Sequence, residues 1–89
     1  MATFHLGTGI TVCGTIIPSK VIDRIYERAR TLDEFAPLDV KQIAFDELGR
    51  QGFNQTIYDR TGEDLMGRWR YRDLIVRIEK GRWKWNDRH

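Results

Sequence analysis

The chain has 89 residues, of which 40% are hydrophobic and 31% charged, and its formal net charge is +2. This size and balance predict one globular domain over residues 1–89 and exclude a largely disordered chain. No apolar run approaches the roughly 20 residues that a membrane-spanning helix needs, so we expect no membrane association. Cys13 is the only cysteine, which excludes an intrachain disulfide. A lone cysteine favours a reducing compartment, and we therefore expect a cytoplasmic protein.

Positive charge is concentrated near the C-terminus. Residues 68–88 hold eight basic and three acidic residues, whereas residues 1–67 hold seven basic and ten acidic ones. A basic segment on a mildly acidic body indicates an anionic partner, although it does not specify which kind.

The first predicted element is a strand or hairpin within residues 3–17. Ile10, Val12 and Ile16 alternate with polar or small residues, and this period of two with β-branched side chains is typical of a strand. Cys13 is expected to serve as a small apolar residue of that strand. The Gly7-Thr8-Gly9 segment predicts either a turn between two strands or a kink in one long strand.

Two short helices are predicted next. Apolar residues at spacings of one, three and four indicate an amphipathic helix from about Lys20 to Leu32, with Ser19 as its N-cap. Asp39, followed three residues later by Gln42, resembles the start of a second helix. Gly49 is expected to end this helix in a left-handed conformation.

The remainder predicts an antiparallel meander. Its expected strands are Gln55–Asp59, Leu65–Arg72, Leu74–Glu79 and Arg82–Trp85, with turns at Arg60–Glu63 and Lys80-Gly81. The predicted fold class is therefore α+β: an N-terminal strand or hairpin, two short helices, and a C-terminal three- to four-stranded antiparallel meander.

The last hairpin has consequences for both faces of this predicted sheet. A two-residue loop would place Glu79 opposite Arg82 and Arg77 opposite Lys84. The same alternation would put the tryptophans on one apolar face, which we expect to be mostly buried. Six basic residues would then share the opposite face: Arg68, Arg70, Arg72, Arg77, Arg82 and Lys84.

This basic face has two interpretations. It is either a solvated surface, where long arginine stems cover apolar groups and keep their charge in water, or a binding face for phosphates or carboxylates. Arginine outnumbers lysine on it, which favours the planar two-point contacts that both anions accept. Aromatic residues interleave with the basic ones, as in proteins that stack single-stranded bases, but strict alternation would point the rings into the core instead.

The sequence holds no recognisable catalytic set. His5 and Cys13 are too few to ligate a metal, and no glycine-rich segment has the spacing of a phosphate-binding loop. The acids Asp59, Glu63 and Asp64 are expected at a solvated turn. We therefore expect no enzymatic activity, no cofactor and no metal.

Two functions remain. The first is a small interaction protein that binds and modulates, or inhibits, a larger partner with an acidic surface, as accessory and anti-defence proteins of phages and mobile elements do. The second is a module that binds DNA or RNA through the basic face of the C-terminal sheet. A gel shift with nucleic acid at low salt would separate them.

Overall fold

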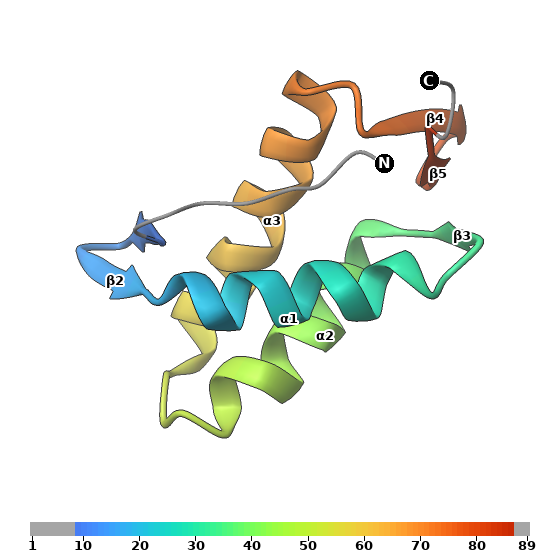
Figure 1. Cartoon of the computed structure of the whole chain (residues 1–89). Helices are drawn as coiled ribbons and strands as arrows, with labels where there is room; N and C mark the ends of the chain where they lie inside the picture. The colour runs from blue at the N-terminus through green and yellow to red at the C-terminus, as the bar shows by residue number, and fades with distance from the viewer. Residues whose placement is uncertain (1–8, 87–89) are drawn as a thin grey trace.

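The computed structural model describes residues 9–86, and Figure 1 shows their arrangement. Two strands, β1 (Ile10–Val12) and β2 (Thr15–Ile17), form an N-terminal antiparallel hairpin. Three helices follow: α1 (Ser19–Arg30), α2 (Pro37–Gly49) and α3 (Gln55–Tyr71). A short strand β3 (Glu34–Phe35) precedes α2, and the strands β4 (Ile75–Glu79) and β5 (Arg82–Trp85) end the described part of the chain. The fold is thus α+β, as predicted.

The N-terminal segment is a hairpin rather than one long strand. Its turn is made by Cys13 and Gly14, whose φ angles of 50° and 76° are both left-handed. Two consecutive positive φ angles match the right-handed twist of the flanking strands. Cys13 is therefore an exposed turn residue and not the strand residue that its alternation predicted. The expected turn at residues 7–9 falls mainly on residues outside the described part.

The first two helices lie where the apolar spacing predicts them. The stripe of α1 is buried as expected, but Pro18 occupies the N-cap position and Ser19 is already helical. α2 starts at Pro37, two residues before its predicted start, and the Asp39 carboxylate accepts from the backbone N–H of Ala36 at 2.8 Å. Arg28 ties α1 to α2 through Asp46 and Glu47, and the hydrogen bond to Asp46 raises the pKa of its guanidinium.

The predicted strands Gln55–Asp59 and Leu65–Arg72 are wrong, because both segments belong to the single helix α3. The Asn54 side chain caps this helix by accepting from the backbone N–H of Ile57 at 3.1 Å. The buried face of α3 follows a helical spacing and consists of Ile57, Thr61, Gly62, Leu65, Met66 and Trp69. The expected turn at Arg60–Glu63 therefore lies in the middle of a helix.

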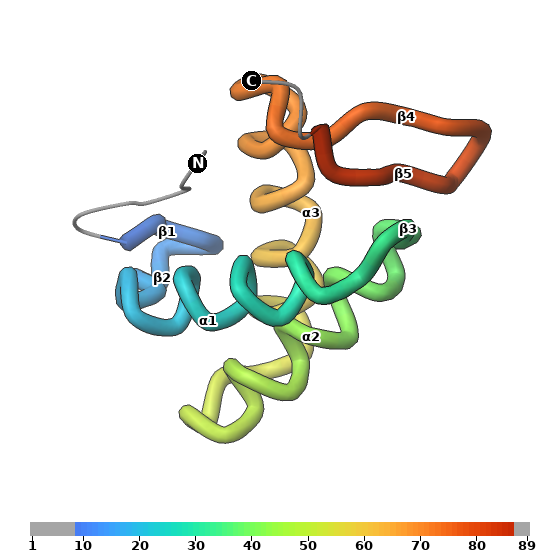
Figure 2. The backbone as a smooth tube through the Cα atoms, turned by 45° about the vertical axis from the view of Figure 1, so that its right-hand side comes forward, coloured from blue at the N-terminus to red at the C-terminus, as the bar shows by residue number. Residues whose placement is uncertain are grey.

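The C-terminal sheet has three strands in the order β3–β5–β4. Its Lys80-Gly81 turn and the pairing of Glu79 with Arg82 are confirmed. Beyond that pair the register shifts by one residue, so that Trp83 pairs with Arg77 and Lys84 pairs with Val76. The bulge at Ile78 removes the predicted like-charge pair of Arg77 and Lys84. Figure 2 shows β4 and β5 extending sideways from the C-terminal end of α3.

An aromatic cluster joins the helices to this sheet. Trp85 lies 5.1 Å from Trp69, 5.4 Å from Tyr26 and 5.2 Å from Phe35 between ring centroids. Its indole N–H donates to the buried backbone carbonyl of Ala29 at 3.0 Å. The predicted burial is confirmed for Trp69 and Trp85, which are 0% and 7% exposed, whereas Trp83 is only half-buried.

Candidate nucleic-acid interface

The six basic residues expected on one sheet face come from two different elements. Arg68 and Arg70 lie in the last turn of α3, and Arg72 is the residue that caps it. Arg77, Arg82 and Lys84 lie on β4 and β5. The predicted arrangement is wrong because residues 68–71 belong to α3. A helix places successive side chains about 100° apart instead of alternating them between two faces. The predicted uniform basic sheet face therefore does not exist.

Some of these cations already have acidic partners within the chain. Arg68 pairs with Asp64 one helical turn earlier, with 2.7 Å between Nε and Oδ2. Arg82 pairs with Glu79 at 3.3 Å and also with Glu34 of the neighbouring strand. These two arginines contribute less to an attractive positive field than an unpaired cation would.

A second group keeps its charge uncompensated. The Arg70 guanidinium lies over the Trp83 ring, 5.1 Å from its centroid, and Arg77 is the cross-strand neighbour of Trp83. The Arg77 side chain donates to the backbone carbonyl of Glu79 at 3.4 Å. Among residues 9–86, neither arginine forms an ion pair with a carboxylate. We call this group the Arg70–Trp83–Arg77 cluster; Lys80 and Lys84 lie on the same hairpin without an ion pair to any described residue.

The outward side of α3 is the second component of the site. Five exposed residues follow one another at spacings of four and three, and so lie along a single helical stripe. This α3 stripe consists of Thr56, Arg60, Glu63, Gly67 and Arg70. It ends at the Arg70–Trp83–Arg77 cluster, so the stripe and the basic hairpin form one continuous surface.

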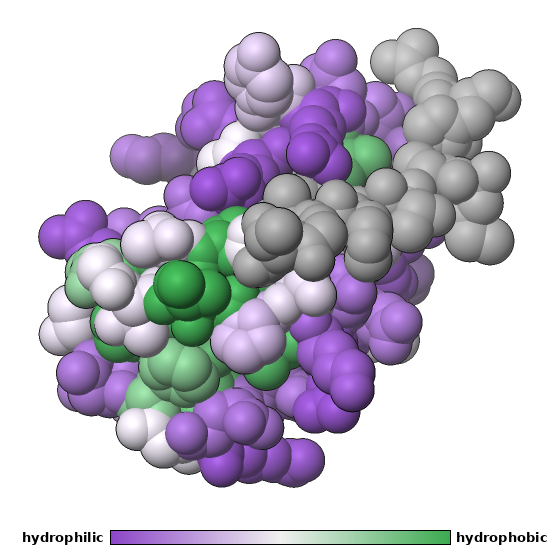
Figure 3. Space-filling view, turned by 60° about the vertical axis from the view of Figure 1, so that its left-hand side comes forward, coloured by the Kyte–Doolittle hydropathy of each residue, from purple (hydrophilic) through white to green (hydrophobic). Residues whose placement is uncertain are grey.

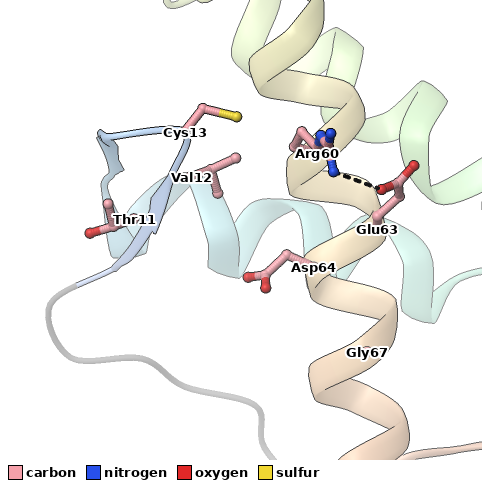
Figure 4. Close-up of a pocket in the computed structure, with 7 residues that line it drawn as sticks. All are labelled: Thr11, Val12, Cys13, Arg60, Glu63, Asp64 and Gly67. Atoms are coloured by element: carbon pink, nitrogen blue, oxygen red, sulfur yellow. Dashed lines mark ion pairs between the residues drawn. The ribbon is translucent and has the colours of Figure 1, made fainter.

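A hollow of about 460 Å³ lies beside the stripe, between α3 and the β1–β2 hairpin. Figure 4 shows Thr11, Val12 and Cys13 across from the α3 residues that line it, with the Asp64 carboxylate directed toward the hairpin. Glu63 is held by Lys41 at 3.2 Å and by Arg60 at 4.0 Å. Both carboxylates that line the hollow are thus paired with cations of α2 or α3.

The two hairpins that flank α3 differ in charge. Residues 10–17, which span β1 and β2, include no acidic or basic residue, and Ile16 is 67% exposed. Figure 3 shows apolar surface on this side of the molecule, surrounded by hydrophilic residues. The β4–β5 hairpin, by contrast, holds Arg77, Lys80, Arg82 and Lys84. A phosphate would therefore be attracted to only one of the two hairpins.

The helices α2 and α3 follow one another in the chain and pack together, in the order of the two helices of a helix–turn–helix motif. Residues 50–54 connect them, and Gly52 supplies a left-handed φ of 84° in the turn. The helices make a close contact where Gly62 meets Lys41, since a Cβ at Gly62 would lie 2.7 Å from the Lys41 Cγ. The connection is slightly longer than the three or four residues, roughly, that are common in this motif.

No three His, Cys, Asp or Glu side chains within residues 9–86 are close enough together to hold a metal ion. The acids Asp59, Glu63 and Asp64 belong to α3 and not to the turn on which they were expected. Within the same part of the chain, no helix combines the length and apolar character required to traverse a lipid bilayer.

Comparison with protein-family models, curated proteins and solved structures gives no match for this chain.

The α3 stripe was missed by the sequence analysis because α3 was interpreted as two strands. The available signal was the four-residue spacing of Ile57, Thr61, Leu65 and Trp69 after the capping residue Asn54. The alternation of arginine with aromatic residues at positions 68–72 concealed it, because that pattern is typical of a strand.

Proposed function

We propose that this protein binds duplex DNA, with α3 in the major groove and the β4–β5 hairpin against the phosphate backbone. The observation that supports this most is the continuity of the α3 stripe with the Arg70–Trp83–Arg77 cluster. In helix–turn–helix proteins the second helix enters the major groove, and backbone contacts beside it set its orientation.

The dimensions and chemistry of α3 suit a major groove. A 17-residue helix is about 25 Å long, and the groove is wide enough to admit one. Thr56, Arg60 and Glu63 are side chains of types that hydrogen-bond to base edges. Duplex RNA is expected to bind more weakly in this mode, because its major groove is too deep and narrow for a helix.

The phosphate contacts are assigned to cations without acidic partners. Arg70 and Arg77 supply two of them beside Trp83, and Lys80 supplies a third from the turn of the same hairpin. Lys84 is the cross-strand neighbour of Val76 and Glu34, so it lies on the other face of the hairpin. Arg70 is restrained by its contact with Trp83, so it loses less side-chain freedom on binding than a fully solvated arginine would. Neutralising about three phosphates predicts a slope near −3 in a plot of log affinity against log salt.

The acids on α3 oppose this attraction only in part. Glu63 and Asp64 are paired with Lys41 and Arg68, respectively, which reduces the field that a phosphate would meet. A carboxylate at the base edges can also accept a hydrogen bond from the amino group of cytosine.

The proposal is tested by titrating a random-sequence DNA duplex at several salt concentrations. The double variant Arg70→Gln/Arg77→Gln should bind more weakly and lower the salt slope by about 2. The control, Lys20→Gln/Arg24→Gln, removes the same charge from exposed positions on α1 and should leave the slope unchanged. Equal effects of both variants, or no duplex binding by the natural chain at low salt, would contradict the proposal.

A second candidate is the interaction protein expected from the sequence. Tyr71 is 91% exposed and Ile78 is 44% exposed, and they lie next in sequence to Arg70 and Arg77. Tyrosine and arginine are frequent in the energetically dominant part of protein interfaces. Under this alternative the partner is a larger protein with an acidic surface, of the kind that accessory or anti-defence proteins of phages and mobile elements modulate.

The two candidates respond differently to salt and to Tyr71→Ala. A packed protein interface should lose at least tenfold in affinity on removal of an anchoring tyrosine and should depend only weakly on salt. Phosphate binding should show the steep salt dependence and little effect of this variant. Either function is compatible with a cytoplasmic location, which the lone cysteine favours.

A further inference from the structure

Two glycines of α3 differ in what surrounds them. A Cβ at Gly62 would lie 2.7 Å from Lys41 Cγ and 3.0 Å from Lys41 Cα, so packing of α3 against α2 requires a glycine there. A Cβ at Gly67 would meet nothing within 4 Å. Gly67 also lies well inside the helix, and its φ is not in the left-handed region. Among the described residues, neither packing nor backbone conformation requires glycine at position 67.

A glycine in a helix interior lowers stability relative to alanine, because it loses more backbone freedom on folding and adds no contacts. Gly67 therefore weakens α3 without any structural gain within residues 9–86. One use of such a glycine is to let an external group approach the helix backbone closely.

The position of Gly67 fits such an approach. It lies in the α3 stripe, one turn after Glu63 and one turn before the C-terminal end of the helix. It also lines the hollow beside the β1–β2 hairpin, where the surface is recessed. A group that follows the stripe toward the Arg70–Trp83–Arg77 cluster would pass directly over this bare backbone.

The two charged residues before Gly67 form a donor and an acceptor side by side. Arg60 Nη1 lies 4.0 Å from Glu63 Oε2, and both side chains are exposed on the stripe. Arginine donates to the O6 and N7 atoms of guanine, and glutamate accepts from the N4 amino group of cytosine. This pair is complementary to the major-groove edge of a G·C base pair or of two adjacent ones.

We infer that Gly67 is the point where DNA approaches α3 most closely, and that Arg60 and Glu63 make the chain prefer sites with G·C pairs. This inference rests on the proposed binding of duplex DNA. Beyond that function, we assign sequence preference to residues of the α3 stripe and phosphate binding to a separate group of cations.

The test begins with selection of preferred duplexes from a randomised pool by the full chain. The selected site and an unrelated duplex are then titrated with Arg60→Ala, Glu63→Gln and Gly67→Gln. We expect the Arg60 and Glu63 variants each to reduce preference at one G·C position by about 5- to 100-fold. Gly67→Gln should weaken binding to the selected site at least tenfold and leave binding to the unrelated duplex within about twofold, since the hairpin cations remain.

Two controls separate an effect on binding from an effect on folding. Gly67→Ala should raise the melting temperature by about 4–8 °C, because alanine is the better helix residue. Gly49→Gln adds the same side chain at another exposed helical glycine, on α2, and should not change the preference.

Different results would overturn different conclusions. If the natural chain binds no duplex at low salt, the proposed function is wrong. If it binds duplexes but Gly67→Gln and the Arg60 and Glu63 variants keep the same sequence preference, only the inference is wrong. A Gly67→Ala variant that melts at a lower temperature than the natural chain would also contradict the inference, because the glycine would then have a structural role.

Discussion

Replacing Gly62 with alanine is expected to destabilise the protein, although alanine is the better helix former. The new Cβ would lie 2.7 Å from Lys41 Cγ, 3.0 Å from Lys41 Cα and 3.3 Å from the Lys41 backbone nitrogen. Two of these atoms belong to the backbone of α2, so a side-chain rotation cannot relieve the contact. The helices would have to move apart by a few tenths of an ångström.

The change in the free energy of unfolding caused by Gly62→Ala combines two opposing effects. Overpacking a close contact costs about 1–3 kcal/mol, and the gain in helix propensity returns about 0.8–1.0 kcal/mol. Because two of the three contacts are with backbone atoms, the upper half of the overpacking range, about 2–3 kcal/mol, applies. The net loss at Gly62 is therefore about 1–2 kcal/mol, which lowers the melting temperature of a domain this small by about 4–16 °C. Gly67→Ala, in the same helix, has the propensity gain without the contact, and its free energy of unfolding should rise by about 1 kcal/mol.

Urea unfolding of the two variants and the natural chain, followed by the fluorescence of the buried Trp69 and Trp85, measures these differences. The two substitutions should shift the unfolding midpoint in opposite directions. A Gly62→Ala variant as stable as the natural chain would refute the reasoning, because α2 and α3 could then not be in such close contact.

Two further substitutions test the core and the start of α3. Trp85→Phe removes the hydrogen bond to Ala29 and part of the buried ring, and should lower the free energy of unfolding by about 1–3 kcal/mol; unchanged stability in urea unfolding would contradict the position of this indole in the core. Asn54→Ala removes the side chain that caps α3 and should lower the free energy of unfolding by about 0.5–2 kcal/mol. Asn54→Asp retains a capping oxygen and should keep most of that stabilisation. If thermal melts show that Asn54→Ala and Asn54→Asp are equally stable, the cap does not stabilise the helix.

Elements whose residues bury a single, regular face were predictable from the sequence. The apolar residues of α1 recur at helical spacing, and those that form this stripe within the helix are buried in the core. The Lys80-Gly81 turn was also predictable, because a two-residue loop with glycine at a φ of 78° depends only on neighbouring residues. In both cases the determining interactions are local.

The helix α3 was decided by tertiary packing. Its sequence alternates basic with aromatic residues at positions 68–72, which favours a strand locally, although the apolar residues from Ile57 to Trp69 recur at helical spacing. In the folded chain Trp69 enters the aromatic core at 0% exposure, whereas Tyr71 is 91% exposed. A strand would have placed both rings on one face. The close contact of Gly62 with α2 and the burial of Trp69 against Trp85 select the helix instead.

The candidate site follows from that same choice. The basic residues were identified from composition alone, but their positions depended on the conformation of residues 65–72 and on a one-residue bulge at Ile78. The helical conformation spreads side chains around an axis, whereas the bulge moves the following side chains to the opposite face of the strand. The sequence determined which charges the surface has. Packing between α2, α3 and the C-terminal sheet decided which of them lie together, because a side chain's direction depends on the secondary structure that its neighbours in space stabilise.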